Sequence, residues 1–259
     1  MKISVIVPYC NLDMSRIKGL DATIDSIDNQ TFKDYESIFV EHCNSKDYQL
    51  LLLKYKFTKK IILEHTSGFN KSWCMNVAAR EAVGEWLVFV DADMAFGNNY
   101  FEKALEWINL HKPKFFVGWN EILKQAGRDE PQERIVSPII RTAGGVFWVK
   151  KDFFWSIGGM NENYENYGGE DNDFWYRANY ELGGSIKRLV GPHLLYRMTH
   201  IYHHNAEASP DRLRHLNLAV EYPKEINMRL RISNLGKKEK PTNIYVDDLR
   251  PRKPLYREC

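Results

Sequence analysis

The sequence predicts one α/β domain in which a mixed, mainly parallel sheet is flanked by helices. Two observations lead to this fold class. Short apolar runs alternate along the chain with segments whose apolar residues recur at helical spacing, the order expected of parallel strands joined by right-handed crossovers. Residues 86–90, "WLVFV", are apolar at every position, which is typical of a central strand covered on both faces. At 259 residues, the chain is long enough to bury a substantial core.

The first elements follow directly from the N-terminus. Residues 3–9, "ISVIVPY", predict a buried strand, and residues 35–41, "YESIFVE", predict the next one. Between these strands, four apolar side chains recur at helical spacing and predict a helix with one inward face: Ile17, Leu20, Ile24 and Ile27.

The following segments repeat this alternation. Residues 47–57 predict a helix and residues 60–65 a third strand. A helix from about Ser72 to Val83 then precedes the apolar strand at 86–90, and Gly84 ends it. The inward face of this helix is expected to carry Trp73, Val77 and Ala78.

The charge balance and the cysteine pattern narrow the class of protein. The chain has 36 basic against 34 acidic residues, a formal net charge of +2, so we expect no nucleic-acid partner. Its four cysteines show no C-x-x-C spacing and no disulfide-dense pattern, which favours a reduced, cytoplasmic setting. The sequence shows neither a signal-peptide pattern nor a membrane-length apolar run, so we expect it to act in solution or peripherally at the inner face of a membrane.

The C-terminal segment differs in composition from the rest. Residues 236–259 mix basic residues with prolines and predict an extended basic tail, which leaves residues 1–235 for the folded domain. A loosely ordered, solvated tail is the simpler interpretation. The alternative is contact with anionic lipid headgroups or with a partner chain.

Two carboxylates follow the apolar strand directly. Asp91 and Asp93, separated by Ala92, stand where the carboxyl end of a parallel strand meets the expected ligand-binding edge of the sheet. Such a pair can hold a hard divalent cation that bridges to phosphate oxygens. The alternative is an ordinary turn, because aspartate after a strand is common.

A second acidic segment lies further along, at residues 163–177, "NYENYGGEDNDFWYR". Glu170, Asp171 and Asp173 suit the first turn of a helix, where carboxylates meet the positive end of the helix dipole. That structural interpretation does not explain Gly168 and Gly169, which let the backbone approach another group closely.

Together these segments resemble a known family. Residues 2–205 resemble the GT-A glycosyltransferases: "SVIVPYCN" and "GFNKSWCMNVAAREAVGEWLVFVDADM" are similar to the nucleotide-sugar-binding half of the family 2 type. The segment "TAGGVFWVKKDFFWSIGGMNENYENYGGEDNDFWYRA" resembles the β-1,4-galactosyltransferases and the chondroitin-polymerase-type transferases. Two residues depart from the galactosyltransferase motif: Tyr167 replaces a tryptophan and Asn172 an acid. The resemblance implies a GT-A (Rossmann-like) fold with a donor-binding half at 1–97 and an acceptor-binding, catalytic half at 98–235.

The resemblance also implies an activity and roles for the acidic segment. An acceptor hydroxyl is a poor nucleophile at neutral pH, so a carboxylate must take its proton. Asp171 is the implied general base, and Glu170 positions the acceptor or shares this role. Tyr167, Gly168 and Gly169 are expected to line the acceptor. One displacement then inverts the anomeric centre of a sugar delivered by a UDP-sugar donor to a glycan acceptor.

A divalent cation, Mn²⁺ or Mg²⁺, is expected at the first acidic pair. Asp91 and Asp93 would need a further ligand, and "RMTHIYHHN" supplies His200, His203 and His204. His200 lies where related enzymes place a histidine on a late strand. Strand alternation sends His200 and His204 to one face and His203 to the other, so at most a subset can serve, and His203 is the alternative to His200.

The donor nucleotide is expected near the ends of the first strands. Besides the segment from Asp91 through Ala92 to Asp93, the expected contacts are Pro8, Tyr9, Glu41, Asn76 and Arg80. Glu41 can accept a hydrogen bond from the uracil imide. The structural alternatives are plain strand ends for the first three residues and a solvated helix face for the last two.

The sequence thus predicts an inverting, metal-dependent transferase that moves a hexose or N-acetylhexosamine, with galactose or N-acetylgalactosamine favoured. Two alternatives remain. A sugar nucleotidyltransferase should carry a glycine-rich basic loop after the first strand, where this chain has "PYCNLDMSR". A non-catalytic glycan-binding module would need neither acidic pair.

Overall fold

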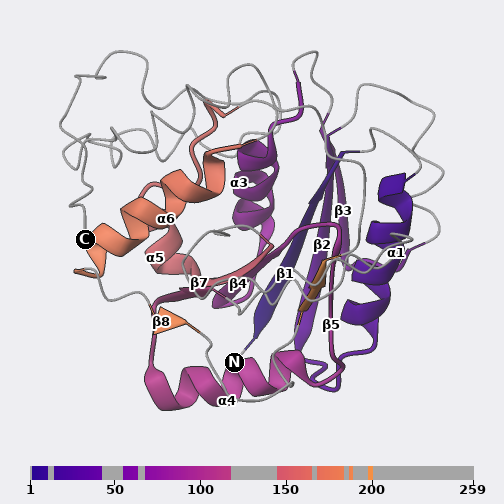
Figure 1. The fold of residues 1–259 in the computed structure, drawn as a ribbon, viewed down its shortest axis with the longest axis horizontal. Coiled ribbons are helices and arrows are strands. Elements are labelled where there is room, and N and C mark those ends of the chain that lie inside the picture. The colour runs from indigo at the N-terminus through magenta and orange to yellow at the C-terminus, as the bar shows by residue number, and fades with distance from the viewer. Residues whose placement is uncertain are drawn as a thin grey trace, which may run out of the picture.

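The protein is built in three layers, with a central sheet between two groups of helices (Figure 1). The computed structural model describes residues 2–10, 15–42, 55–63, 68–117, 145–164, 168–183, 187–188 and 198–200. Its strands are β1 Ile3–Tyr9, β2 Tyr35–His42, β3 Lys59–Leu63, β4 Trp86–Val90, β5 Met94–Phe96, β6 Phe115–Val117, β7 Val146–Lys150, β8 Lys187–Arg188 and β9 Met198–His200. Its helices are α1 Ser15–Asp28, α3 Lys71–Glu81, α4 Tyr100–His111, α5 Lys151–Ser156 and α6 Glu170–Glu181.

The main sheet is mixed and mainly parallel, as the sequence predicts. Within the described residues it has seven strands in the order β3-β2-β1-β4-β7-β6-β8. β1 pairs in parallel with β2 and β4, whereas β7 runs antiparallel to both β4 and β6. A separate small sheet pairs β5 with β9 in antiparallel fashion. The described helices include none that is long and apolar enough to cross a membrane.

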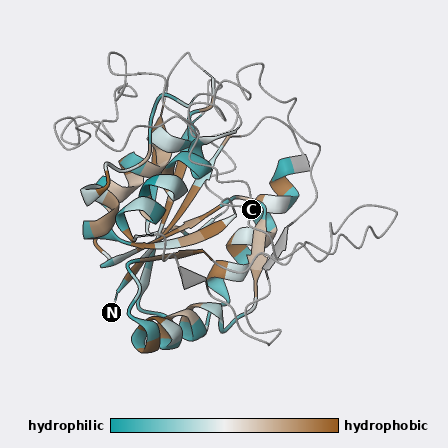
Figure 2. Cartoon of the chain, turned by 60° about the vertical axis from the view of Figure 1, so that its left-hand side comes forward, coloured by the Kyte–Doolittle hydropathy of each residue, from teal (hydrophilic) through white to brown (hydrophobic). Residues whose placement is uncertain are grey.

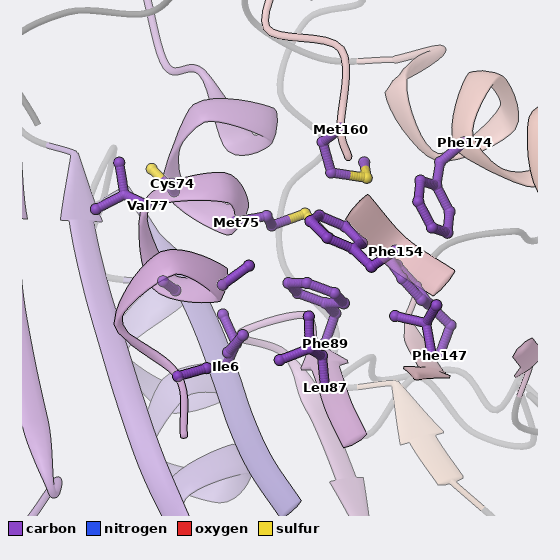
Figure 3. Close-up of a cluster of buried hydrophobic side chains, with 14 of the residues drawn as sticks. Ile6, Cys74, Met75, Val77, Leu87, Phe89, Phe147, Phe154, Met160 and Phe174 are labelled. Atoms are coloured by element: carbon purple, nitrogen blue, oxygen red, sulfur yellow. The ribbon is translucent and has the colours of Figure 1, made fainter. Parts of the chain in front are cut away.

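The apolar strand β4 contributes to both faces of the sheet, because successive side chains of a strand point to opposite sides. Trp86, Val88 and Val90 pack with residues of α1 and α4 on one face. Leu87 and Phe89 pack on the other face with residues of α3, α5 and α6, a cluster drawn in Figure 3. Hydrophobic residues accordingly predominate on the strands, whereas the helices carry both hydrophilic and hydrophobic residues (Figure 2). The prediction of a doubly covered strand is confirmed.

The predicted boundaries are close to those observed, with one correction. The helix predicted at 47–57 does not include residues 55–57, which form no helix; residues 47–54 lie outside the described part. Tyr55 donates a hydrogen bond to Asp21, and Phe57 stacks on Phe39 at 4.9 Å between ring centroids. The apolar spacing of residues 55–57 suggested a helix, but these aromatic side chains instead make contacts with α1 and β2. The predicted tail, 236–259, also lies outside the described residues, so its tail character stays a prediction.

The sheet edge at the amino ends of the parallel strands is tied together by a buried carboxylate. Glu36 accepts hydrogen bonds from the Ser4 hydroxyl and from the Val83 N–H, each at 2.5 Å. The Ser4 hydroxyl in turn accepts a bond from the Gly84 N–H at 2.8 Å. This network fixes the turn between α3 and β4, so it orients the helix that begins at the opposite edge.

Candidate active site

The candidate site lies at the carboxyl ends of the parallel strands, the edge at which open α/β sheets bind ligands. Tyr9 at the end of β1 is the register partner of Glu41 near the end of β2. Asp91 follows β4, which pairs with the other side of β1. The sequence-predicted residues at these three strand ends therefore share one edge of the sheet.

Asp91 is held in place by the start of β7. Its N–H donates to the Gly145 carbonyl at 2.8 Å, and its Oδ2 accepts from the Gly145 N–H at 3.0 Å. Helix α1 packs against the turn that follows, since a Cβ on Gly19 would lie 3.1 Å from the Asp93 Cβ and 3.2 Å from the Ala92 carbonyl oxygen. The turn is thus fixed from two sides, by β7 and by α1.

The start of α3 is equally constrained. The Asn70 side-chain oxygen caps the helix by accepting from the Trp73 N–H at 2.8 Å, and its amide donates to the Glu162 carbonyl at 2.7 Å. The Asn70 N–H donates to His42 Nδ1 at the end of β2, at 3.1 Å. These bonds give the next residue, Lys71, a defined position at the site.

Helix α6 begins at two residues that only glycine accommodates without strain. Gly168 and Gly169 have φ angles of 111° and 96°, in the left-handed region. The helix is anchored by Arg177, whose Nε and Nη2 donate to Asp173 Oδ2 at 2.9 and 2.6 Å, while Nη1 donates at 2.7 Å to each of two carbonyls, those of Ile157 and Gly159. Asp173 therefore belongs to the anchor, and Glu170 and Asp171 are the acids left to face the site.

Lys71 brings the two acidic segments together. Its Nζ lies 2.8 Å from Asp91 Oδ1, 3.0 Å from Asp171 Oδ2 and 3.6 Å from Glu170 Oε1. The predicted metal ligand Asp91 and the predicted catalytic pair thus surround one ammonium group. Sequence reasoning missed Lys71, because a lysine at the start of a helix resembles a solvated residue. The available signal was its position: a cation is unfavourable at the positive end of a helix dipole.

The charges of this cluster depend on one another. Desolvation would lower the pKa of Lys71, but Asp171, Asp91 and Glu170 together raise that pKa well above its ordinary value. Burial raises the pKa of Asp171 to about 7; Lys71 opposes this rise, and Glu170 and Asp91 add to it. Lys71 is therefore protonated at neutral pH, whereas Asp171 changes its protonation state near neutrality.

The residues predicted to hold the nucleotide fall into two groups. Tyr9 and Glu41 lie on neighbouring strands, and burial raises the pKa of Glu41 to about 7. Asn76 instead lies inside the protein, where its side-chain amide donates to the Met160 carbonyl and to Glu162 Oε1 and its oxygen accepts from the Met160 N–H. Arg80 lies over the Trp155 ring, 4.5 Å from the centroid. The contacts of Asn76 and Arg80 indicate positioning roles, and their donor contacts stay predictions.

The described side chains show no group of three or more histidine, cysteine or acidic residues arranged to hold a metal. Two features nevertheless fit a cation. The register of β5 and β9 pairs His200 with Met94, the residue after Asp93. Glu170 Oε2 is buried and has no hydrogen-bond partner among the described residues. The side chain of His200, like the whole of His203 and Tyr167, lies outside what the structure describes.

Known proteins share this sequence pattern and this fold. Residues 4–198 match the family model "Glycosyl transferase family 2". An uncharacterized glycosyltransferase of Haemophilus influenzae is 30% identical over 188 residues, which are 66% of this chain and 60% of that protein. TarS of Staphylococcus aureus, a poly(ribitol-phosphate) beta-N-acetylglucosaminyltransferase, is 29% identical over 115 residues, 43% of this chain and 19% of that protein.

Two solved structures show the same architecture. The crystal structure of TarS residues 1–349 in complex with UDP-GlcNAc has a TM-score of 0.62 at 23% identity and covers 85% of this chain and 66% of that one. The crystal structure of GalNAc-T7 with UDP, GalNAc and Mn²⁺ has a TM-score of 0.58 at 18% identity and covers 78% of this chain and 43% of that one. The fold is therefore that of the GT-A glycosyltransferases, and the chain belongs to glycosyl transferase family 2.

Proposed function

We propose that this chain transfers a hexose or N-acetylhexosamine from a UDP-sugar to a glycan hydroxyl, with inversion and with the help of a divalent cation. One observation carries the proposal: Asp91, Glu170 and Asp171 lie within 3.6 Å of the same ammonium group, at the ligand-binding edge of the sheet. Asp91, proposed to act on the donor, thus lies next to Glu170 and Asp171, which are proposed to act on the acceptor. The UDP-GlcNAc complex of TarS supports a UDP-sugar as donor.

The proposed reaction is a single displacement. The acceptor oxygen forms a bond to the anomeric carbon of the donor sugar while the bond from that carbon to the UDP oxygen breaks. Asp171 takes the acceptor proton, and a pKa near 7 suits a general base that works at neutral pH. Glu170 orients the acceptor, together with Tyr167 and the backbone at Gly168 and Gly169. Attack from the side opposite the leaving UDP inverts the anomeric centre.

The cation in this proposal is Mn²⁺ or Mg²⁺. Asp91 and Asp93 would hold it, with His200 or His203 as a further ligand, because carboxylate oxygen and imidazole nitrogen suit these ions. When bound, it supplies charge neutralisation for the diphosphate that leaves. Within the described part of the chain, carboxylates outnumber cations around Lys71 and Glu170 Oε2 has no hydrogen-bond partner, which supports a place for additional positive charge.

The identity of the donor sugar is proposed less specifically than that of the nucleotide. Resemblance to the galactosyltransferases favours galactose or N-acetylgalactosamine, whereas TarS was crystallised with UDP-GlcNAc. Discrimination among such sugars depends on a few hydroxyl contacts. Membership of a transferase family favours group transfer over the two alternatives, a sugar nucleotidyltransferase and a glycan-binding module.

The test is release of UDP from a panel of UDP-sugars with Mn²⁺, compared with the same reactions in EDTA. We expect release from one or two donors, and we expect both EDTA and Asp91→Ala to abolish it. Glu106→Gln is a matched control, because this carboxylate lies on α4 and pairs with Lys103. Binding and turnover of no UDP-sugar would contradict the proposed activity. Undiminished turnover in EDTA would contradict only its metal dependence.

A further inference from the structure

Lys71 has an unusual position for a lysine. It is the first residue of α3, where the free N–H groups and the helix dipole favour a negative charge. Its side chain is only 14% exposed, so it loses hydration as well. Neither helix formation nor burial of the aliphatic stem explains a cation here. The three carboxylates around it do, since each has an oxygen within 3.6 Å of the Lys71 Nζ.

Among the residues that the structure describes, the charges around Lys71 do not balance. Three carboxylates face one ammonium, which leaves two negative charges in excess when all three acids are ionised. Glu170 is 7% exposed, and its Oε2 has no hydrogen-bond partner among the described residues. Buried charges are normally paired, so this cluster is suited to more positive charge than the described residues supply.

Lys71 also spans the two acidic segments. Its shortest contact, 2.8 Å, is to Asp91 at the end of β4, and its next is to Asp171 at the start of α6. Asp91 Oδ2 is engaged by the Gly145 N–H, so Oδ1 is the oxygen that Lys71 takes. A cation that binds Asp91 through Oδ1 must share this oxygen with Lys71 or displace it.

We propose that Lys71 is a resident counter-ion that competes with the divalent cation for Asp91. In the ligand-free protein, Lys71 joins Asp91 to Asp171 and Glu170 and so weakens cation binding. A nucleotide diphosphate brings negative charge that can take up the lysine, which frees Asp91. Cation binding is thereby made dependent on the donor. This inference rests on the proposed metal-dependent function and adds a positioning residue to it.

The test is the affinity of the nucleotide-free protein for Mn²⁺ alone, measured by calorimetry or electron paramagnetic resonance. Lys71→Met removes the charge and keeps much of the volume, and we expect it to bind Mn²⁺ at least about tenfold more tightly than the natural protein, within the range typical of coupled sites. Lys71→Arg keeps the charge and should stay within about threefold. Lys103→Met, on α4, controls for the change in net charge because its lysine pairs with Glu106 outside the site.

Added UDP gives a second readout. It should increase Mn²⁺ affinity more in the natural protein than in Lys71→Met, because only the natural protein has a lysine to remove from Asp91. Equal or weaker Mn²⁺ binding by Lys71→Met would overturn the inference even if UDP-sugar turnover is metal-dependent. The proposed function has its own, separate test in the EDTA comparison.

The thermal stability of the variants provides a further measurement in the same test. Without its cation, the carboxylate cluster should lower the thermal unfolding temperature of Lys71→Met in EDTA, and Mn²⁺ should restore it. Lys71→Gln, which keeps a hydrogen-bond donor, should behave in the same way. If neither variant folds even with Mn²⁺ present, a metal cannot replace the lysine charge, and the inference is wrong.

Discussion

The anchor of α6 allows a prediction that links fold to site. Arg177→Met removes the guanidinium that makes two bonds to Asp173 and one bond to each of the Ile157 and Gly159 carbonyls, all at 2.6 to 2.9 Å. Asp173 is fully buried, so the variant leaves a carboxylate without its cation. Breaking a buried ion pair in this way costs about 3–5 kcal/mol, a large share of the ~5–15 kcal/mol by which domains are stable.

Urea unfolding followed by circular dichroism measures this loss, and a second variant isolates its cause. Asp173→Ala combined with Arg177→Met removes both charges, so the pair should be more stable than Arg177→Met alone by about 1–3 kcal/mol. Lys103→Met, which removes an exposed ion pair on α4, should cost at most about 1 kcal/mol. A loss of less than about 1 kcal/mol for Arg177→Met, or no recovery in the double variant, would refute the argument.

Because α6 carries Glu170 and Asp171 at its first turn, the anchor should matter for activity as well. At a temperature where Arg177→Met is still folded, we expect transfer to fall more than donor binding, since displacement of a catalytic group by about 1 Å can lower rates ~100-fold. Steady-state kinetics beside UDP calorimetry would separate the two effects.

Three further predictions concern single sites. Gly84→Ala should lower the urea midpoint by an amount equivalent to about 1–3 kcal/mol, because the new Cβ would lie 2.6 Å from the Ser4 backbone nitrogen; an unchanged midpoint contradicts this. Burial raises the pKa of Glu41 from 4.5 to about 7, so ionisation of its carboxyl group destabilises the folded protein as the pH rises through that range. Glu41→Gln should therefore raise the free energy of unfolding near pH 8 by up to about 3 kcal/mol. Near pH 4, where the carboxyl group is protonated, the variant should leave the free energy of unfolding unchanged. Asp171 must lose its proton to act as base, so kcat/KM should rise with pH through about 7, and a flat pH profile would argue against this role.

The central strand could be predicted from the sequence because a strand buried on both faces is apolar at every position. Residues 86–90 are apolar throughout, and they form the strand that divides the two clusters of the core. The pairing of β7 between β4 and β6 was not readable, because antiparallel contacts between distant segments leave no local signal. The same holds for β5 and β9, whose pairing brings His200 beside the residue that follows Asp93.

The site was predictable where chemistry and position agree. Asp91 follows a buried strand, and Asp171 starts a helix after two glycines, so both were identified as candidates. Lys71 was missed, because only the folded structure shows three carboxylates converging on it. The sequence also gave no sign of the structural role of Asn76, whose amide holds α3 to the Met160 segment, and its predicted donor contact stays a prediction.

The most direct test of the account compares Asp171→Asn with the natural protein, using the donor that the UDP-sugar panel identifies. Transfer to a glycan acceptor and binding of UDP are measured on the same samples, with Glu106→Gln as control. We predict that Asp171→Asn binds UDP within about threefold of the natural protein and transfers sugar at least ~100-fold more slowly, the range expected for loss of a general base. Transfer by Asp171→Asn at the natural rate would contradict the central claim that the acidic segment at the start of α6 performs the chemistry.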